Sequence, residues 1–378
     1  VEKNKTIFYM NEKTVHDIIW IGKTKKVKSW GESCGADEIK SLSDLSADVT
    51  NKKNVMYPPQ FRANNKIQIS ELLNILINQI EKKSSASLIN AIIKQRSIKT
   101  EEEINEIRSA LDITNLMHLK AMQSSSPGKY EHEIVAEMEK IIRSKAIDLA
   151  YPIIFTKNGQ VLHNSVYHNQ ILDGDLLLND SGANSSMHYA SDITRTFPAN
   201  GKFSNKQKEI YIIVQEMQET VIKQLKPGVS FKEMHKLSAY IGIKGLKKLG
   251  LLTGSCDEAL EKGVYGLFYP HGLGHMLGLD VHDMEALGED VVGYDEKIKR
   301  EAEFGITFLR LGKQLEAGFC ITVEPGIYFI PELFNQWKKD KKLSHLINYD
   351  KFESYMNFGG IRIEDNIWIT KENSENLS

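Results

Sequence analysis

Four carboxylates in apolar, strand-like surroundings are the first residues of this chain whose types could do chemistry. They are Asp180, Asp192, Glu324 and Glu364. Carboxylates are seldom buried unless they are paired or bound to a metal. Each has a simpler explanation when taken alone: a turn, an ion pair with Arg195, or the polar side of an edge strand. All four explanations would have to hold at once, so together the carboxylates indicate one functional site.

A glycine-rich strip at residues 271–283, HGLGHMLGLDVHD, adds three histidines to this set. The spacing of His271 and His275 is that of a helical zinc motif, but no Glu follows His271 and the glycines disfavour a helix. We therefore expect a tight loop with close backbone approach, followed by a buried strand over Met276–Val281 that leads to His282. One histidine would join the carboxylates as a ligand, and the other two would face a substrate.

Four carboxylates and one imidazole form a hard, oxygen-rich ligand set. Such a set favours Mn²⁺, Co²⁺ or Fe²⁺ over a thiolate-bound structural zinc. Two divalent ions would balance the four negative charges, and carboxylates that bridge two ions commonly hold a shared hydroxide for hydrolysis. A dinuclear phosphoesterase is the rival, although its substrate would call for more cations near the ligands than Arg195 and Arg362.

Composition excludes several other classes of function. The formal net charge of −2 gives no basic surface for nucleic acid or for an acidic membrane, and no apolar run approaches the 18 residues of a membrane span. The three cysteines are far apart and lack CxxC spacing, which is typical of reduced thiols in a cytoplasmic protein. The chain starts at Val1 on a polar segment without a signal peptide, so we expect a clipped beginning.

Periodicity predicts an α/β protein of two domains. Residues 1–95 form a small α/β domain with an amphipathic helix over Ile69–Ile80, and the larger domain, 96–378, opens with a capping box at Thr100 and Glu103. Further helices are expected at 130–145, at 205–225 and after a second capping box at Ser230 and Glu233, with strands at 151–156, 175–179, 319–323, 361–363 and 367–369. Helices followed by strands thus occur twice, which indicates two similar halves that meet at a shared cleft.

Four segments together resemble one family: LNDSGANSSMHYASDITRTFPANGKFS, HGLGHMLGLDVHD, TVEPGIYF and GGIRIEDN. They are similar to the proline-specific metallopeptidases with the pita-bread fold, prolidase and aminopeptidase P, from about Arg96 to Thr370. Residues 1–95 resemble only the later part of the family's N-terminal domain. The resemblance implies a homodimer with two divalent ions per chain, Mn²⁺ first, with Co²⁺, Fe²⁺ or Zn²⁺ as alternatives. The implied ligands are Asp180, Asp192, His275, Glu324 and Glu364, although the Asp180–Asp192 interval is one residue longer than is usual.

The same resemblance implies roles around the metals. Metal-bound hydroxide would attack the Xaa-Pro bond of proline-containing di- or short peptides, with Glu324 taking the proton of the water. Catalytic contacts would come from Glu324, His271 and His282, and substrate contacts from His163, His271, His282, Arg310 and Arg362. Proline requires a dedicated pocket because its tertiary amide lacks an N–H and restricts the residue before it.

Two features favour a dipeptidase over an aminopeptidase. A long insert, Ile330–Met356, separates Glu324 from Glu364, and Arg310 matches a prolidase arginine that binds the substrate's C-terminal carboxylate. The alternative for Arg310 is a surface cation in a Lys/Arg-rich stretch. Aminopeptidase P, acting on longer peptides, is the second reading. A non-catalytic binding protein on the same fold is disfavoured by the complete ligand set, and methionine aminopeptidase by the histidine strip.

Overall fold

The computed structural model describes residues 4–50, 52 and 54–378, and the chain divides into two compact units, Val1–Asn90 and Ala91–Ser378. The division falls within helix α5 (Ala86–Ser97), in which the expected domain boundary after residue 95 also lies. That boundary, as a limit between functional domains, stays a prediction. No helix in the described ranges has both the length and the apolar character needed to cross a membrane.

The first unit is a small α/β structure built on a parallel strand pair, β1 (Ile7–Tyr9) and β2 (Glu38–Lys40). Its helices are α1 (Val15–Ile21), α2 (Val27–Ser33), α3 (Leu42–Thr50) and α4 (Ala63–Leu73), followed by 3₁₀ turns η1 (Ile77–Gln79) and η2 (Glu81–Lys83). The expected helix through Ile80 is wrong beyond Leu73. Asn74 takes the left-handed conformation (φ 51°), which ends α4 and redirects the chain.

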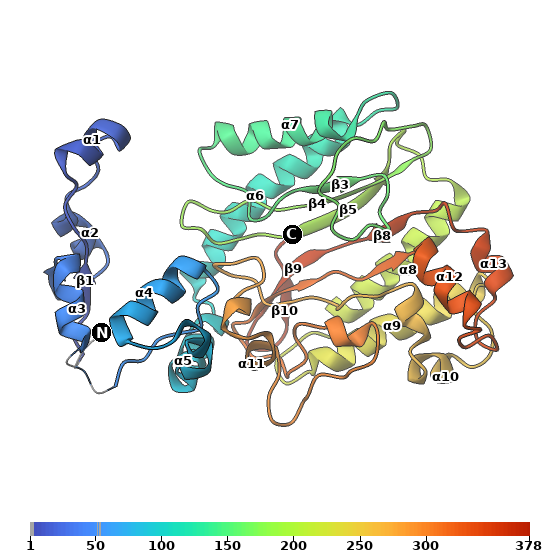
Figure 1. The fold of residues 1–378 in the computed structure, drawn as a ribbon. Coiled ribbons are helices and arrows are strands. Elements are labelled where there is room, and N and C mark those ends of the chain that lie inside the picture. Colours follow the sequence, from blue (N-terminus) through green and yellow to red (C-terminus); the bar gives the residue numbers. More distant parts are fainter. Residues whose placement is uncertain (1–3, 51, 53) are drawn as a thin grey trace. The chain divides into compact units, whose positions relative to one another are not determined.

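The first half of the second unit packs two helices on an antiparallel sheet (Figure 1). The helices are α6 (Glu101–Ser124) and α7 (Glu131–Ser144), and the sheet has the order β3 (Ile154–Thr156), β4 (Leu176–Ser181), β5 (Ile193–Pro198). The predicted capping box opens α6: the Thr100 N–H donates to Glu103 Oε2 (2.8 Å) and the Glu103 N–H to Thr100 Oγ1 (3.3 Å). Met117, Ile134 and Leu177 are fully buried in the core between helices and sheet.

The second half repeats this plan with a helix pair, α8 (Asn205–Ile222) and α9 (Phe231–Lys248). Gly245 lets the helices approach closely, since a Cβ there would lie 2.6 Å from Ile213. Ser230 caps α9 by accepting the Glu233 N–H, but of the two bonds of the expected capping box the structure shows this one alone. The strands are β6 (Cys320–Val323), β9 (Asp365–Ile369) and β10 (Ser374–Asn376) in one sheet, and β7 (Gly326–Tyr328) with β8 (Gly360–Arg362) in another.

Short helices complete this half: α10 (Cys256–Glu261), α11 (Glu289–Gly293), α12 (Pro331–Lys339) and α13 (Tyr349–Glu353), with 3₁₀ turns η3 (Val264–Leu267), η4 (Glu285–Leu287) and η5 (Ile306–Phe308). The insert expected between Glu324 and Glu364 is therefore largely helical, since it contains α12 and α13.

A seam joins the two halves where β5 meets β8 and β9. The Glu364 N–H donates to the Thr194 carbonyl (3.0 Å), and the Asn366 side chain bonds both the N–H and the carbonyl of Asp192. Strands of both halves thus run between α6 and α7 on one side and α8 and α9 on the other (Figure 1). The carboxylates expected to act together lie along this seam.

Candidate active site

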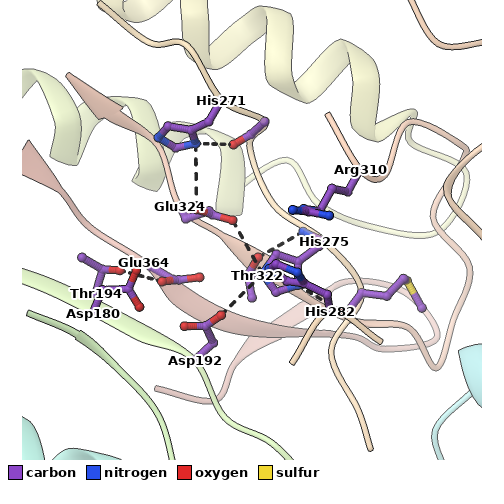
Figure 2. A network of polar contacts seen from close by, with 12 residues as sticks. Asp180, Asp192, Thr194, His271, His275, His282, Arg310, Thr322, Glu324 and Glu364 are labelled. Atoms are coloured by element: carbon purple, nitrogen blue, oxygen red, sulfur yellow. Dashed lines mark hydrogen bonds and ion pairs between the residues drawn. The ribbon is translucent and has the colours of Figure 1, made fainter. Parts of the chain in front are cut away.

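The five expected metal-binding residues converge from strand β4, from the ends of neighbouring strands and from the glycine-rich loop. Asp180 lies in β4 and Asp192 immediately before β5, while Glu324 directly follows β6 and Glu364 lies between β8 and β9. His275 comes from the loop. All five line one cavity of about 850 Å³ in the second unit. Figure 2 shows the carboxylates and His275 facing a common space.

His275 presents a free nitrogen to this space. Its Nδ1–H donates to the Met276 carbonyl (3.0 Å), which leaves the Nε2 lone pair 3.4 Å from Asp192 Oδ2 and 3.7 Å from Glu324 Oε1. Burial lowers the pKa of His275 to about 4, so the ring is neutral at pH 7. One ligand atom each from Asp192, His275 and Glu364 lies within 4.8 Å of the others. This geometry is that of a metal-binding imidazole fixed by its second nitrogen.

The carboxylates are too close and too buried to be stable as isolated anions. Burial and repulsion by neighbouring carboxylates raise the pKa of Asp192, Glu324 and Glu364 well above their usual range. The Tyr151 hydroxyl lies between Asp180 and Asp192, 2.6 Å from Asp180 Oδ1, and Thr194 Oγ1 donates to Glu364 Oε2 (2.7 Å). A divalent cation would relieve the repulsion, so the donor set fits a metal.

Arg362 lines the cavity, is buried (4% exposed) and bonds three neighbouring side chains. It donates to Asp180 Oδ2, to the Tyr328 hydroxyl (2.9 Å) and to Thr194 Oγ1 (3.2 Å). These bonds hold the carboxylate network in place, while the expected contact of Arg362 with substrate stays a prediction.

His271 belongs to the same hydrogen-bonded line. Its Nδ1 lies 2.8 Å from the Gly272 carbonyl and therefore carries the hydrogen, so Nε2 accepts from the Tyr328 hydroxyl (2.8 Å). Burial lowers the pKa of His271 to about 3. The neutral ring stands beside Glu324, with 3.9 Å between Nδ1 and Oε2 (Figure 2).

The remaining expected substrate residues also line this cavity. The His282 ring centroid lies 4.4 Å from that of His275, and burial lowers the pKa of His282 to about 3. Arg310 points toward the histidines (Figure 2) and pairs with Glu285 and with Glu289, whose Oε2 lies 3.6 Å from Nη1. His163 is exposed at the cavity wall.

The strand expected over Met276–Val281 is wrong. Met276 makes a single bridge to Ile321, and the chain then turns back, because the Gly278 N–H bonds the Asp280 carbonyl (3.2 Å) and the Asp283 N–H bonds the Met276 carbonyl (2.9 Å). The expected tight approach of the preceding loop is confirmed: a Cβ at Gly274 would lie 2.1 Å from the Thr322 carbonyl oxygen. This turn is what brings His282 back beside His275.

Several residues of the site were not predicted from the sequence. They are Tyr151, Thr194, Glu285, Thr322 and Tyr328, with apolar lining from Phe304, Phe308, Ile330 and Leu333. Thr194, Thr322 and Tyr328 lie within the segments that resemble the peptidase family, so their proximity to the ligands could have been inferred from the sequence. No sequence pattern indicated Tyr151 or Glu285. Tyr151 contacts residues that are distant in sequence, and Glu285 reaches His282 only because the chain turns between them.

The chain is similar to known peptidases over its whole length. The model of metallopeptidase family M24 matches residues 105–371. A probable Xaa-Pro aminopeptidase of Fusarium vanettenii is 34% identical over 383 residues, covering 100% of this chain and 80% of the relative. The Xaa-Pro dipeptidase of Rattus norvegicus is 32% identical over 401 residues, covering 100% of this chain and 77% of the relative.

Solved structures agree with these relatives. An alanine variant of Escherichia coli aminopeptidase P matches with a TM-score of 0.78 at 29% identity, and it covers 98% of this chain and 78% of its own. A zinc-substituted form of that enzyme, described as a complex with product, matches with a TM-score of 0.77 at 30% identity and the same coverage.

These matches confirm the expected pita-bread fold and the expected kinship with proline-specific peptidases, and the family implies use of a divalent metal. The buried carboxylates around a free imidazole nitrogen are the part of the fold that fits that metal. The chain belongs to metallopeptidase family M24.

Proposed function

We propose that this enzyme hydrolyses the peptide bond that precedes proline, and that it is an Xaa-Pro dipeptidase. The observation that carries the proposal is the convergence of His275 Nε2 with buried carboxylates of both halves in one cavity. The proposed ligands are Asp180, Asp192, His275, Glu324 and Glu364. Four carboxylates call for two divalent ions, with Mn²⁺ preferred for an oxygen-rich set and Co²⁺, Fe²⁺ or Zn²⁺ as alternatives.

The residues around the ligands would orient the substrate and move its protons. When bound, the ions supply Lewis-acid activation of water and of the scissile carbonyl. Glu324 would take the proton of the attacking water, since its carboxylate lines the cavity beside His275 and His271. His271, held by Tyr328, and His282, beside His275, contact the reacting group from either side. His163 and Arg362 complete the proposed substrate contacts.

Arg310 supports the choice of dipeptidase. It faces the cavity beside His282, where its guanidinium would bind the carboxylate of a chain that ends at proline. Helix α12, in the expected insert, narrows the same cavity with Leu333 and Gln336. Relatives named for either activity match with nearly equal identity, so aminopeptidase P activity on longer peptides is the alternative.

The deciding experiment compares an Xaa-Pro dipeptide with an Xaa-Pro-Xaa tripeptide. Arg310→Ala should raise KM for the dipeptide at least tenfold and leave the tripeptide unchanged, while Arg143→Ala, a solvent-exposed control, changes neither. If the tripeptide is the better substrate and Arg310→Ala alters neither rate, the dipeptidase proposal is wrong.

Metal binding is tested separately. Asp192→Asn and His275→Ala should each abolish most activity and lower the metal content measured after reconstitution and dialysis. Wild-type protein that retains fewer than one ion per chain would refute the dinuclear proposal. Near-normal activity of either variant would refute the ligand assignment.

A homodimer and a cytoplasmic location complete the proposal. The location is supported by the three cysteines, which are all free. Light scattering of the purified protein tests the dimer, and fractionation of cells tests the location.

A further inference from the structure

One carboxylate outside the proposed ligand set contacts two of the proposed substrate residues. Glu285 begins η4, directly after Met284 in the left-handed conformation (φ 65°). Its Oε2 lies 2.9 Å from His282 Nδ1, and its Oε1 accepts from Arg310 Nη1. The two oxygens of one side chain thus connect a residue at the reacting centre to one at the far end of the substrate.

We propose that Glu285 is a positioning residue that fixes the tautomer of His282 and the orientation of Arg310. The proposal rests on the proposed function for the roles of these two partners. It predicts that loss of Glu285 affects turnover through His282 and substrate affinity through Arg310, as two separable effects.

The tautomer follows from hydrogen-bond chemistry. A carboxylate paired with a guanidinium only accepts hydrogen bonds, so the hydrogen of a neutral His282 ring lies on Nδ1. Nε2 is then the nitrogen left for the substrate, and the ring is held in one of its two flipped orientations. His282 lies against His275, so this choice decides which nitrogen meets a substrate bound at the ligands.

Arg310 is held at the end of a row of alternating charges. Besides Glu285 it faces Glu289, and Arg300 bonds Glu289 Oε1 (2.6 Å) and the carbonyl of Leu309 (2.8 Å), the residue before Arg310. The guanidinium uses Nη1 for these carboxylates and keeps its other donors for a ligand. Glu289 thus shares Arg310 with Glu285, but the structure gives it no polar contact with His282.

The partial exposure of these three side chains indicates that Glu285 acts mainly by orienting His282 and Arg310, and not by charge attraction alone. The side chains of His282, Glu285 and Arg310 are 36%, 39% and 31% exposed, so solvent screens the attraction between the Glu285 carboxylate and the Arg310 guanidinium. Loss of Glu285 should therefore change where the two partners point more than whether the domain folds.

Glu289→Ala is the matched control for Glu285→Ala. Both variants lose a carboxylate beside Arg310, and Glu285→Ala alone also releases His282. The substrates are Xaa-Pro and its amide, Xaa-Pro-NH₂, which lacks the C-terminal carboxylate. We expect Glu289→Ala to raise KM for the free dipeptide only, and Glu285→Ala to lower kcat roughly tenfold on both substrates. The Glu285→Ala loss of kcat should persist in an Arg310→Ala background. Equal kcat in the two single variants would overturn the proposal.

A second measurement needs no activity. In metal-free protein with ¹⁵N-labelled histidine, long-range ¹H–¹⁵N correlations distinguish the two tautomers, and comparison with His282→Gln assigns the signal. We expect Nδ1–H for His282 in wild type and in Glu289→Ala, and loss of this preference in Glu285→Ala. An Nε2–H tautomer in wild type would overturn the proposal. If wild type hydrolyses neither peptide, the proposed function fails, while the spectrum still decides the role of Glu285.

Discussion

Replacing Lys99 by Met should destabilise the catalytic unit more than any surface substitution. Lys99 precedes α6, and its ammonium donates to Asp283 Oδ2 (3.0 Å) and to the Arg96 carbonyl (2.6 Å). The side chains of Lys99 and Asp283 are each 1% exposed. Methionine keeps the volume and removes the charge, which leaves Asp283 buried with Arg96 as its remaining cation.

The magnitude follows from this remaining partner. Removing one member of a buried ion pair costs about 3–5 kcal/mol when the other charge is left alone. Arg96 Nη2 stays on Asp283 Oδ1, so we expect a cost just below that range, about 2–3 kcal/mol. In a unit that spans Ala91–Ser378 this loss corresponds to a fall of about 3–5 °C in melting temperature.

Urea unfolding followed by circular dichroism measures the effect, with Lys223→Met as the matched control. Lys223 pairs with Glu219 on the surface of α8, and the two side chains are 73% and 48% exposed, so its loss should be nearly silent. A Lys99→Met protein within about 0.5 kcal/mol of wild type would refute the reasoning, because that value is typical of surface substitutions.

Three further predictions concern glycine, histidine and metal. Gly274→Ala should lose bound metal in dialysis, because its Cβ would meet the Thr322 carbonyl at 2.1 Å and displace β6; wild-type metal content would contradict this. Burial lowers the pKa of His235 to about 3, so this residue alone contributes a loss of stability as pH falls below about 6.5, by about 2 kcal/mol at pH 5. His235→Phe should lose less unfolding free energy than wild type between pH 7 and pH 5, as measured by urea titrations at both pH values. An equal loss in the two proteins would contradict the burial argument. Metal at a hundredfold excess over Kd should stabilise the chelated protein by about 2.7 kcal/mol for each ion bound. Without metal, the site carboxylates with raised pKa should lower the melting temperature as pH rises, which a scan from pH 7 to 8, above the ordinary pKa of histidine, measures.

That the five proposed ligands line one cavity could be predicted from sequence, because each of their motifs shows its own chemistry. Asp192 and Glu324 stand out as charges among apolar neighbours, and that contrast needs no partner to be seen. The helices with one apolar face could also be predicted. Helix α6 begins after its predicted capping box, and α8 begins at Asn205, where the helix over 205–225 was expected to begin. Their residue patterns reflect burial against the sheets.

What escaped prediction depends on contacts between distant segments or on a single backbone dihedral. Asn74 ends α4 through a left-handed conformation that its neighbours' apolar spacing does not reveal. The apolar run after Met276 reads as a strand, but its turn is closed by backbone bonds that no side-chain pattern encodes. Tyr151 reaches Asp192 only because the sheet folds them together.

The seam between the halves has a consequence for how the enzyme is made. Asp180 and Asp192 are translated before Glu364, whose N–H bonds the Thr194 carbonyl across the seam. A nascent chain therefore holds an incomplete site until Glu364 has been translated. We expect the peptidase to stay inert until β8 and β9 have emerged and Glu364 can bond across the seam.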